Sequence, residues 1–153
     1  MGFTCCYNEC YYKEIMVRRY ELIDHTADIG IAAYGDDLEG AFANAACALF
    51  SIIAELDGVG GDVSRDVEVD ARDVEGLLVE GLNELIYIFD TENIIFKTFK
   101  IDEIGENNLR ARCFGERVDL KRHRLKTGVK AATYHMVEVR KNDGVRVQVL
   151  LDV

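Results

Sequence analysis

The first regular pattern in the chain is a pair of short runs in which apolar and polar positions alternate. The two runs lie within residues 19–34 and flank the polar segment 24–28. Alternation with a period of two is typical of strands that are buried on one face. The sequence therefore predicts two strands around a turn in this region.

Two longer segments repeat their apolar residues at the spacing of a helix. The first begins after Gly35, where Asp36 and Glu39 have the spacing of a capping box, and runs toward Ala54. The second begins at Asp73, whose side chain is a good helix N-cap. Each segment therefore predicts a helix with one apolar face that must be buried. The apolar positions are Leu38, Phe42, Ala45, Ala46, Leu49 and Ile53 in the first helix, and Val74, Leu77, Leu78, Leu82, Leu85, Ile86 and Phe89 in the second.

The remaining regular pattern is that of strands. A run at residues 63–69 alternates valines with charged residues and predicts an edge strand. Strands and helices are segregated along the chain rather than repeated as βαβ units, which favours an antiparallel arrangement. We therefore expect an α+β fold with a single domain, in which two helices pack on one side of a mainly antiparallel β-sheet. The strands expected after the second helix are residues 94–104, 109–114, 116–120, 129–139 and 145–153.

The charge of the chain narrows the classes of function. The chain has 28 acidic and 18 basic residues and a net charge of -10. A protein with this charge lacks the positive field that draws nucleic acids to a surface, so autonomous, nonspecific RNA or DNA binding is not expected. No apolar run is long enough to predict a membrane span or a secretory signal. We expect a cytoplasmic protein.

Three of the five cysteines, Cys5, Cys6 and Cys10, lie in the first ten residues. Their spacing lacks the paired pattern of a structural zinc site, so zinc binding is the less favoured interpretation. A disulfide framework is also not expected in a chain that can bury its own core. We assign residues 1–18 to a variable N-terminal extension that need not be ordered, and residues 19–153 to the domain.

Two acidic sites carry the candidate chemistry. Asp24 and Asp28 lie in the predicted turn, and Asp152 is followed by Val153, whose terminal carboxylate adds a second acidic group at the end of the sequence. Oxygen donors of this kind suit Ca²⁺, Mg²⁺ or Mn²⁺. The end of the sequence is thus a plausible half of a metal site. Asp24 and Thr26 can equally form an Asx or ST turn between the strands.

Three motifs occur together in order along the chain. They are Asp-His-Thr-Ala-Asp at residues 24–28, Lys-Ala-Ala-Thr-Tyr-His at residues 130–135 and Leu-Asp-Val at residues 151–153. Together with residues 20–23, 29–30, 35–50, 82–86, 115–116 and 129, these motifs resemble the archease family. The resemblance runs from about residue 20 to the last residue and leaves out the cysteine-bearing extension.

The resemblance implies an accessory protein rather than an enzyme. Archeases are partners of the GTP-dependent RtcB-type RNA ligase in tRNA splicing and RNA repair. They promote guanylylation of the active-site histidine of the ligase and help it to turn over repeatedly. Carried over by position, the resemblance implies that Asp28, Asp152 and Val153 hold a divalent metal, Ca²⁺ or Mg²⁺/Mn²⁺, and that Lys130 is the lysine needed for ligase activation.

Other interpretations of these residues stay open. Asp24 and His25 are expected beside the metal ligands, although a turn histidine is more often a hydrogen-bonding group. Lys130 is either an exposed strand lysine or a point charge for a phosphate or a partner carboxylate. A metal-dependent phosphohydrolase would use Asp24, His25, Asp28 and His135, and a third function is that of a chaperone-like partner of a tRNA methyltransferase. The sequence has neither a Walker-type phosphate loop nor a Gly-x-Ser-x-Gly motif.

Residues 121–126 form a basic run in an acidic protein. Short charge runs usually mark exposed loops, so a solvated hairpin tip is the simpler interpretation. The functional alternative is contact with RNA or with an acidic face of the ligase.

Overall fold

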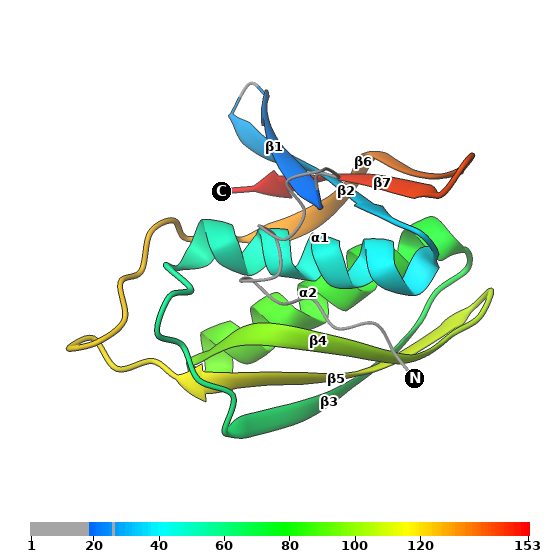
Figure 1. Cartoon of the computed structure of the whole chain (residues 1–153). Helices are drawn as coiled ribbons and strands as arrows, with labels where there is room; N and C mark the ends of the chain where they lie inside the picture. Colours follow the sequence, from blue (N-terminus) through cyan, green and yellow to red (C-terminus); the bar gives the residue numbers. More distant parts are fainter. Residues whose placement is uncertain (1–18, 26) are drawn as a thin grey trace.

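The computed structural model describes residues 19–25 and 27–153, apart from the side chain of His25 (Figure 1). The expected extension at residues 1–18, its three cysteines and Thr26 lie outside the described residues. Within the described part, seven strands and two helices follow one another along the chain. Their bounds are Tyr20–His25 (β1), Asp28–Gly35 (β2), Leu38–Ile53 (α1), Val63–Asp70 (β3), Val74–Glu92 (α2), Ile94–Ile104 (β4), Asn108–Arg117 (β5), Ala131–Lys141 (β6) and Val145–Asp152 (β7).

The described elements form three layers (Figure 1). Strands β1, β2, β7 and β6 form, in this order, a four-stranded sheet, and β3, β5 and β4 form a three-stranded sheet. The strand pairs of the described part are antiparallel. The two helices lie between the sheets, with α1 against β2 and β4 and α2 against β6 and β3. The predicted α+β fold is confirmed, but its strands divide into two sheets, so the helices are covered on both sides.

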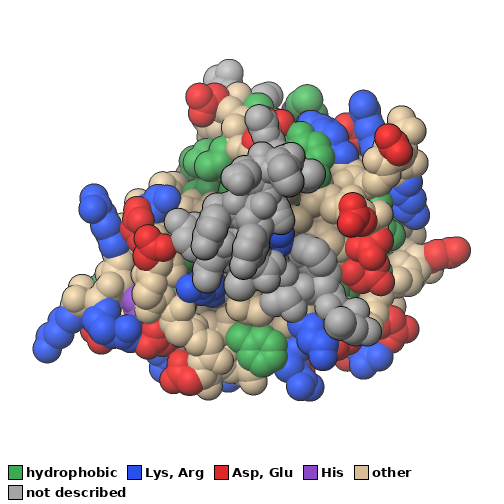
Figure 2. Space-filling view, in the orientation of Figure 1, with side chains coloured by type: hydrophobic (Ala, Val, Ile, Leu, Met, Phe, Trp, Pro, Cys, Tyr) green, Lys and Arg blue, Asp and Glu red, His purple; other side chains and the backbone are tan. Residues whose placement is uncertain are grey.

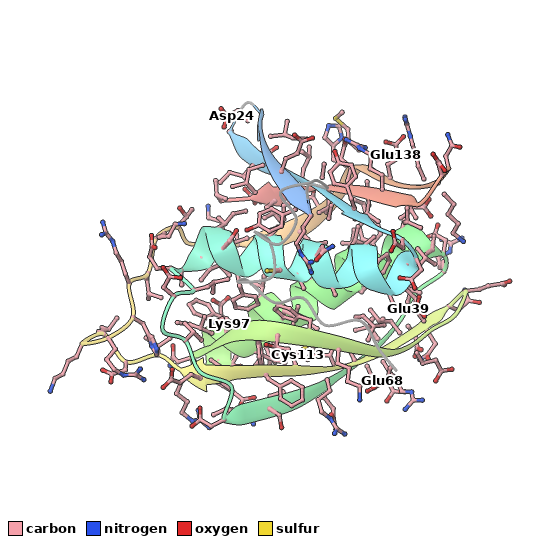
Figure 3. All side chains as sticks on the ribbon, viewed as in Figure 1. Asp24, Glu39, Glu68, Lys97, Cys113 and Glu138 are labelled. Atoms are coloured by element: carbon pink, nitrogen blue, oxygen red, sulfur yellow. The ribbon has the colours of Figure 1, made fainter. Side chains whose placement is uncertain are left out.

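Apolar side chains of the helices fill the space between the sheets. The ring of Phe50 in α1 lies against those of Phe96 and Phe99 in β4, with ring centroids 5.7 and 5.9 Å apart. These contacts between almost fully buried rings add to the gain from burial itself. Cys47 and Cys113 are buried, and Cys113 lies on the inner side of the three-stranded sheet (Figure 3). Burial raises the pKa of the Cys113 thiol to about 12, so this thiol is unreactive.

One of the two predicted helix N-caps is correct and the other is not. Asp73 caps α2 as predicted, because its side chain accepts a hydrogen bond of 2.8 Å from a backbone N–H of the first turn. In α1 the cap is Asp37, whose side chain accepts a hydrogen bond of 2.8 Å from the N–H of Gly40. The predicted capping box of Asp36 and Glu39 is therefore wrong, since the chain stays extended for one residue longer.

The predicted strand at residues 116–120 is also wrong. The backbone carbonyl of Asp119 accepts hydrogen bonds of 2.9 and 2.7 Å from the residues that follow, and its carboxylate accepts one of 3.0 Å from the N–H of Lys121. A local turn of this kind competes with the hydrogen bonds of a strand. Residues 118–130 consequently form a loop that leads from the three-stranded sheet to the four-stranded sheet (Figure 1).

Other predictions for the fold are confirmed. Strand β3 lies at the edge of its sheet, with exposed charges between its valines. Strand β4 has the predicted bounds, residues 94–104, and β1 and β2 form the predicted antiparallel pair. Neither helix of the described part combines the length and the apolar character that a bilayer span requires.

Candidate functional site

The strand register brings the two predicted acidic sites together. In the pairing of β2 with β7, Asp28 stands directly opposite Asp152. In the pairing of β6 with β7, Ala131 stands opposite the same Asp152, and the backbone N–H of Lys130 donates a hydrogen bond of 2.8 Å to the Asp152 carbonyl. Residues from distant parts of the sequence thus meet at one end of the four-stranded sheet.

The two carboxylates share the outer face of this sheet. Directly opposed residues of an antiparallel pair point to the same face, and adjacent residues along a strand point to opposite faces. The adjacent residues Ile29 and Leu151 pack into the core on the helix side, and Leu151 is fully buried. Asp28 and Asp152 therefore point away from the helices, and Asp152 is exposed.

The acidic pair Asp28 and Asp152 places two like charges in directly opposed positions of the sheet. Like charges in directly opposed positions destabilise a sheet, by on the order of 0.5 kcal/mol. A cation between the carboxylates replaces this repulsion with attraction. Both donors are hard oxygens, which suit Ca²⁺, Mg²⁺ and Mn²⁺. The chemistry of the acidic pair therefore fits a divalent cation, as one part of a coordination shell.

The described side chains do not complete such a shell. In the part of the chain that the structure describes, no group of three or more His, Cys, Asp or Glu side chains could hold a metal ion. Val153, the predicted third contributor, follows Asp152 directly and is 36% exposed. Because Ca²⁺ takes about 6 to 8 oxygen ligands, further donors must come from the main chain, from water or from another molecule.

The other predicted site residues lie in different places. Lys130 is exposed and precedes β6, next to the backbone of Asp152. Asp24 stands opposite Ile29, so the register places it on the other face of the sheet from Asp28, near the tip of the β1–β2 hairpin (Figure 3). His25 is the backbone partner of Asp28, and its side chain lies outside the described residues.

The structure does not bring His135 to the acidic pair. His135 is exposed on β6, within the register shift between Thr133 and Glu138. It forms no metal-holding cluster with Asp24 and Asp28 in the described part. The four-residue hydrolase centre considered from the sequence is therefore not assembled by these three side chains.

Comparison with known proteins decides the family. The chain matches the model of the Archease protein family over residues 20–153. It is 40% identical over 141 residues to protein archease of Methanosarcina barkeri, an alignment that covers 89% of this chain and 97% of the relative. The chain belongs to the archease family. It is also 41% identical over 128 residues to the archease of Pyrococcus furiosus, covering 82% of this chain and 90% of the relative.

Solved structures share the archease fold with this chain. The solution structure of protein 1598 from Methanobacterium thermoautotrophicum is similar with a TM-score of 0.75 at 39% identity, covering 90% of this chain and 100% of that one. The crystal structure of an archease from Thermotoga maritima, described as a possible chaperone, has a TM-score of 0.56 at 20% identity and covers 90% of this chain and 98% of that one. The second likeness supports the fold alone.

In this archease, the loop after β5 is held by a polar cluster that the sequence did not reveal. His123 is buried, and its Nδ1 accepts a hydrogen bond of 2.9 Å from the N–H of Asp119. The imidazole proton is therefore on Nε2, which donates to Glu116 Oε1 at 3.1 Å. Glu116 also accepts from the N–H of Gly60 at 2.9 Å and pairs with Arg122. The pKa of Glu116 is lowered to about 2. The hydrogen bond from Gly60 has the largest effect, the hydrogen bonds from Arg122 and His123 add to it, and desolvation opposes them only in part.

The prediction of a hairpin tip at residues 121–126 is wrong. The strands that flank this run, β5 and β6, belong to different sheets and do not form a hairpin. His123 is buried in the cluster, whereas the other five residues of the run are exposed, as expected for a solvated segment. No pattern in the sequence distinguishes the buried histidine from its charged neighbours.

Sequence reasoning also missed Asn83 of α2, which extends the edge of β6. Its Nδ2 donates to the carbonyl of Ala132 at 3.1 Å, and its Oδ1 accepts from the N–H of Ala132 at 2.7 Å. The side-chain amide thus takes the place of a neighbouring strand and fixes the start of β6, beside Lys130. Helical periodicity gave no signal for this role, because Asn83 falls away from the helix face that carries Leu78, Leu82 and Leu85.

Proposed function

We propose that this archease activates a GTP-dependent RtcB-type RNA ligase in tRNA splicing and RNA repair. In this proposal the protein catalyses no reaction of its own but promotes guanylylation of the ligase and its repeated turnover. The observation that carries the proposal is the opposition of Asp28 and Asp152 on the outer face of the sheet, with Lys130 bonded to the backbone of Asp152. Membership of the archease family supports the choice of partner.

The acidic pair and Val153 are the proposed ligands of a divalent cation, Ca²⁺ or Mg²⁺/Mn²⁺. A bound divalent cation offsets the negative charge of phosphoryl oxygens. The pair presents its oxygens on an open sheet face, where a second molecule can add donors. Lys130 adds an ammonium group for a phosphate or a carboxylate of the partner. Asp24 and His25 are proposed to support this end of the sheet rather than to bind the cation.

An accessory role suits the location of the acidic pair. Catalytic centres are usually concave and exclude water. The described part of the chain contains an apolar cavity of about 30 Å³ between the helices and the three-stranded sheet, lined by residues such as Leu77, Phe99 and Leu109. No residue of β2, β6 or β7 lines this cavity. The separation of the acidic pair from this cavity supports a role on a partner rather than on a substrate enclosed by this chain.

The test is guanylylation of a cognate ligase with labelled GTP and a divalent cation, with and without the archease. We expect wild type to accelerate the reaction, and Asp28→Asn, Asp152→Asn and Lys130→Gln to lose the acceleration. Thermal unfolding of each variant checks that the fold is intact.

Asp143→Asn is the matched control for the two aspartate variants. Asp143 is an exposed aspartate in the turn between β6 and β7, and its φ of 66° is one that asparagine also adopts. This variant is expected to accelerate guanylylation as wild type does. Full acceleration by Asp28→Asn and Asp152→Asn would contradict the proposed role of the pair.

Two other functions predict different results in the same experiments. Turnover of phosphoesters by the purified archease alone would favour a metal-dependent phosphohydrolase. Stabilisation of a tRNA methyltransferase, without any effect on ligase guanylylation, would favour the chaperone-like function. The cytoplasmic location expected from the sequence stays a prediction that cell fractionation can check.

A further inference from the structure

Residues 118–130, the loop between β5 and β6, carry the further inference, and we name them the docking arm. The arm ends at Lys130, which bonds to Asp152, and it extends from the same end of the molecule as the acidic pair (Figure 1). We propose that the docking arm binds an acidic surface of the RNA ligase and inserts Leu120 into an apolar pocket of that surface. This inference rests on the proposed function, since it takes the ligase as the partner.

The tip of the docking arm is fixed from within. Asp119 accepts the N–H groups of Lys121, Arg122 and His123, at 3.0, 2.9 and 2.7 Å. The buried His123 ring links this turn to Glu116 at the end of β5. A loop with this many internal hydrogen bonds has one preferred shape, which lowers the entropic cost of binding a partner.

The second half of the docking arm is attached to the end of α1. The carbonyl of Arg124 accepts from the N–H of Glu55 at 2.9 Å, and the N–H of Lys126 donates to the carbonyl of Ile53 at 2.7 Å. The ammonium of Lys126 donates to the carbonyl of Ser51, also at 2.7 Å. The backbone of the docking arm is therefore held in both halves, which fixes the places from which its exposed side chains extend.

This fixed turn presents a leucine to water. Leu120 is 75% exposed, more than any other large apolar side chain in the described part. Single exposed leucines are common on protein surfaces and need no explanation alone. Here, however, the leucine follows Asp119, whose hydrogen bonds set the turn, and it precedes the exposed Lys121. An apolar side chain with basic neighbours on a rigid projection suits a pocket that has an acidic rim.

The charge of the docking arm is opposite to that of the whole protein. The arm contains five basic residues and one acidic residue, in a chain of net charge -10. Figure 2 shows Lys and Arg side chains gathered at this end of the molecule. Arg122 is paired with Glu116 and Asp119, but the exposed side chains of Lys121 and Arg124 have no ion pair with a described residue. These two charges are available to an acidic partner.

An acidic protein surface fits the docking arm better than RNA does. Proteins that bind single-stranded RNA commonly stack its bases on aromatic side chains, and residues 118–130 contain no aromatic residue other than the buried His123. The negative charge of the rest of the chain also opposes a phosphate backbone. An apolar pocket for Leu120, by contrast, is a feature of protein surfaces.

The experiment measures the affinity of fluorescently labelled, full-length archease for the ligase at low and high salt. Leu120→Ser is expected to weaken binding about tenfold at both salt concentrations, because apolar burial is not screened. Lys121→Glu combined with Arg124→Glu is expected to weaken binding about tenfold at low salt and less at high salt. Leu120→Met should keep the affinity of wild type. Lys141→Glu, an exposed residue at the other end of β6, is the control and should bind within about twofold of wild type.

The outcomes separate this inference from the proposed function. Wild-type guanylylation is measured with the same samples. Suppose that wild type accelerates guanylylation while Leu120→Ser and the double charge variant bind the ligase as wild type does. The inferred role of the docking arm is then wrong, and the proposed function is unaffected. If the double charge variant loses affinity for a labelled single-stranded RNA but not for the ligase, the arm is an RNA contact and the inference is wrong. If wild type neither binds nor activates the ligase, both fail.

Discussion

Two residues of like charge stand opposite each other at each end of the four-stranded sheet, but the groups around the two pairs differ. At one end Arg140 of β6 stands opposite Arg146 of β7, and Glu138 carboxylate oxygens lie 2.8 Å from Arg140 and 3.7 Å from Arg146. At the other end Asp28 stands opposite Asp152, and the neighbouring positions across the sheet are Ala131 in β6 and His25 in β1. The single Glu138 carboxylate of β6 therefore bridges the two arginines and offsets part of their charge. We propose that the aspartate pair instead binds a cation from outside the chain.

The three-stranded sheet shows the arrangement expected where charges only stabilise the fold. Asp66 stands opposite Arg112 at a salt-bridge distance of 3.0 Å. Arg110 stands opposite Glu103 and forms a salt bridge of 2.6 Å with it. Opposed charges of opposite sign contribute favourably to sheet stability, although exposed pairs contribute little. The like-charged aspartate pair departs from this rule, which is typical of a functional site.

The largest expected effect comes from converting the aspartate pair into an ordinary ion pair. Asp152→Lys places a cation opposite Asp28, as Arg112 lies opposite Asp66. We expect this variant to lose ligase activation completely. It should gain roughly 0.2–1 kcal/mol in the free energy of unfolding, because repulsion is replaced by attraction. Guanylylation and urea unfolding measure the two effects, and an active variant would show that the pair does not need a bound cation.

The second largest expected effect is a loss of stability at the start of β6, the strand that follows Lys130. Asn83→Ala removes both hydrogen bonds to the backbone of Ala132, a residue that is only 5% exposed. Unpaired buried backbone groups cost about 1–3 kcal/mol, so we expect a loss of that size in the free energy of unfolding. Urea unfolding measures it. Glu84→Ala, one residue along the same helix, is the control and should change stability little; equal losses in both variants would argue against a specific role of Asn83.

Acid should remove the contribution that the Glu116 carboxylate makes to stability. Glu116 has a pKa of about 2 in the folded protein and an ordinary value of 4.5. A lowered pKa means that the contribution of Glu116 to stability is complete above about pH 4.5 and is lost as the pH falls toward about 2. Stability measured across this range should fall less steeply in Glu116→Gln than in wild type. Parallel curves would show that the carboxylate makes no such contribution.

The smallest expected effect lies at the arginine end. Glu138→Gln leaves Arg140 opposite Arg146 without the shared carboxylate. Because these groups are partly exposed, the expected loss in the free energy of unfolding is about 0.5 kcal/mol, and it should shrink in high salt. Ligase activation should be unchanged. Glu106→Gln, at an exposed position outside the sheets, is the control, and a loss of activation in Glu138→Gln would place function at both ends of the sheet.

The fold could be predicted where one local signal dominates. The alternation of residues 94–104 and the N-cap at Asp73 gave the right elements because each depends on neighbours in the sequence. The pattern at residues 116–120 failed because the side chain and backbone of Asp119 close a turn that alternation does not register. Alternation also cannot show that the strands divide between two sheets.

The residues of the candidate site could be predicted from the sequence, but their arrangement could not. Family motifs pointed to Asp28, Asp152 and Lys130, but only the register shows that the two aspartates are directly opposed. Pairing between strands at the two ends of the domain is a tertiary property that local patterns do not contain. The roles of Asn83 and His123 escaped prediction for the same reason, since their partners are distant backbone groups or side chains that become neighbours only in the fold.

The most direct test of the central claim is cation binding by the acidic pair itself. Isothermal titration of wild type with millimolar Ca²⁺, Mg²⁺ and Mn²⁺, combined with thermal unfolding, measures binding and the stabilisation that accompanies it. We expect at least one of these ions to bind wild type and Asp143→Asn and to raise their melting temperatures. Asp28→Asn and Asp152→Asn should lose both responses. Equal binding by wild type and the two pair variants would contradict the claim that Asp28 and Asp152 hold a cation.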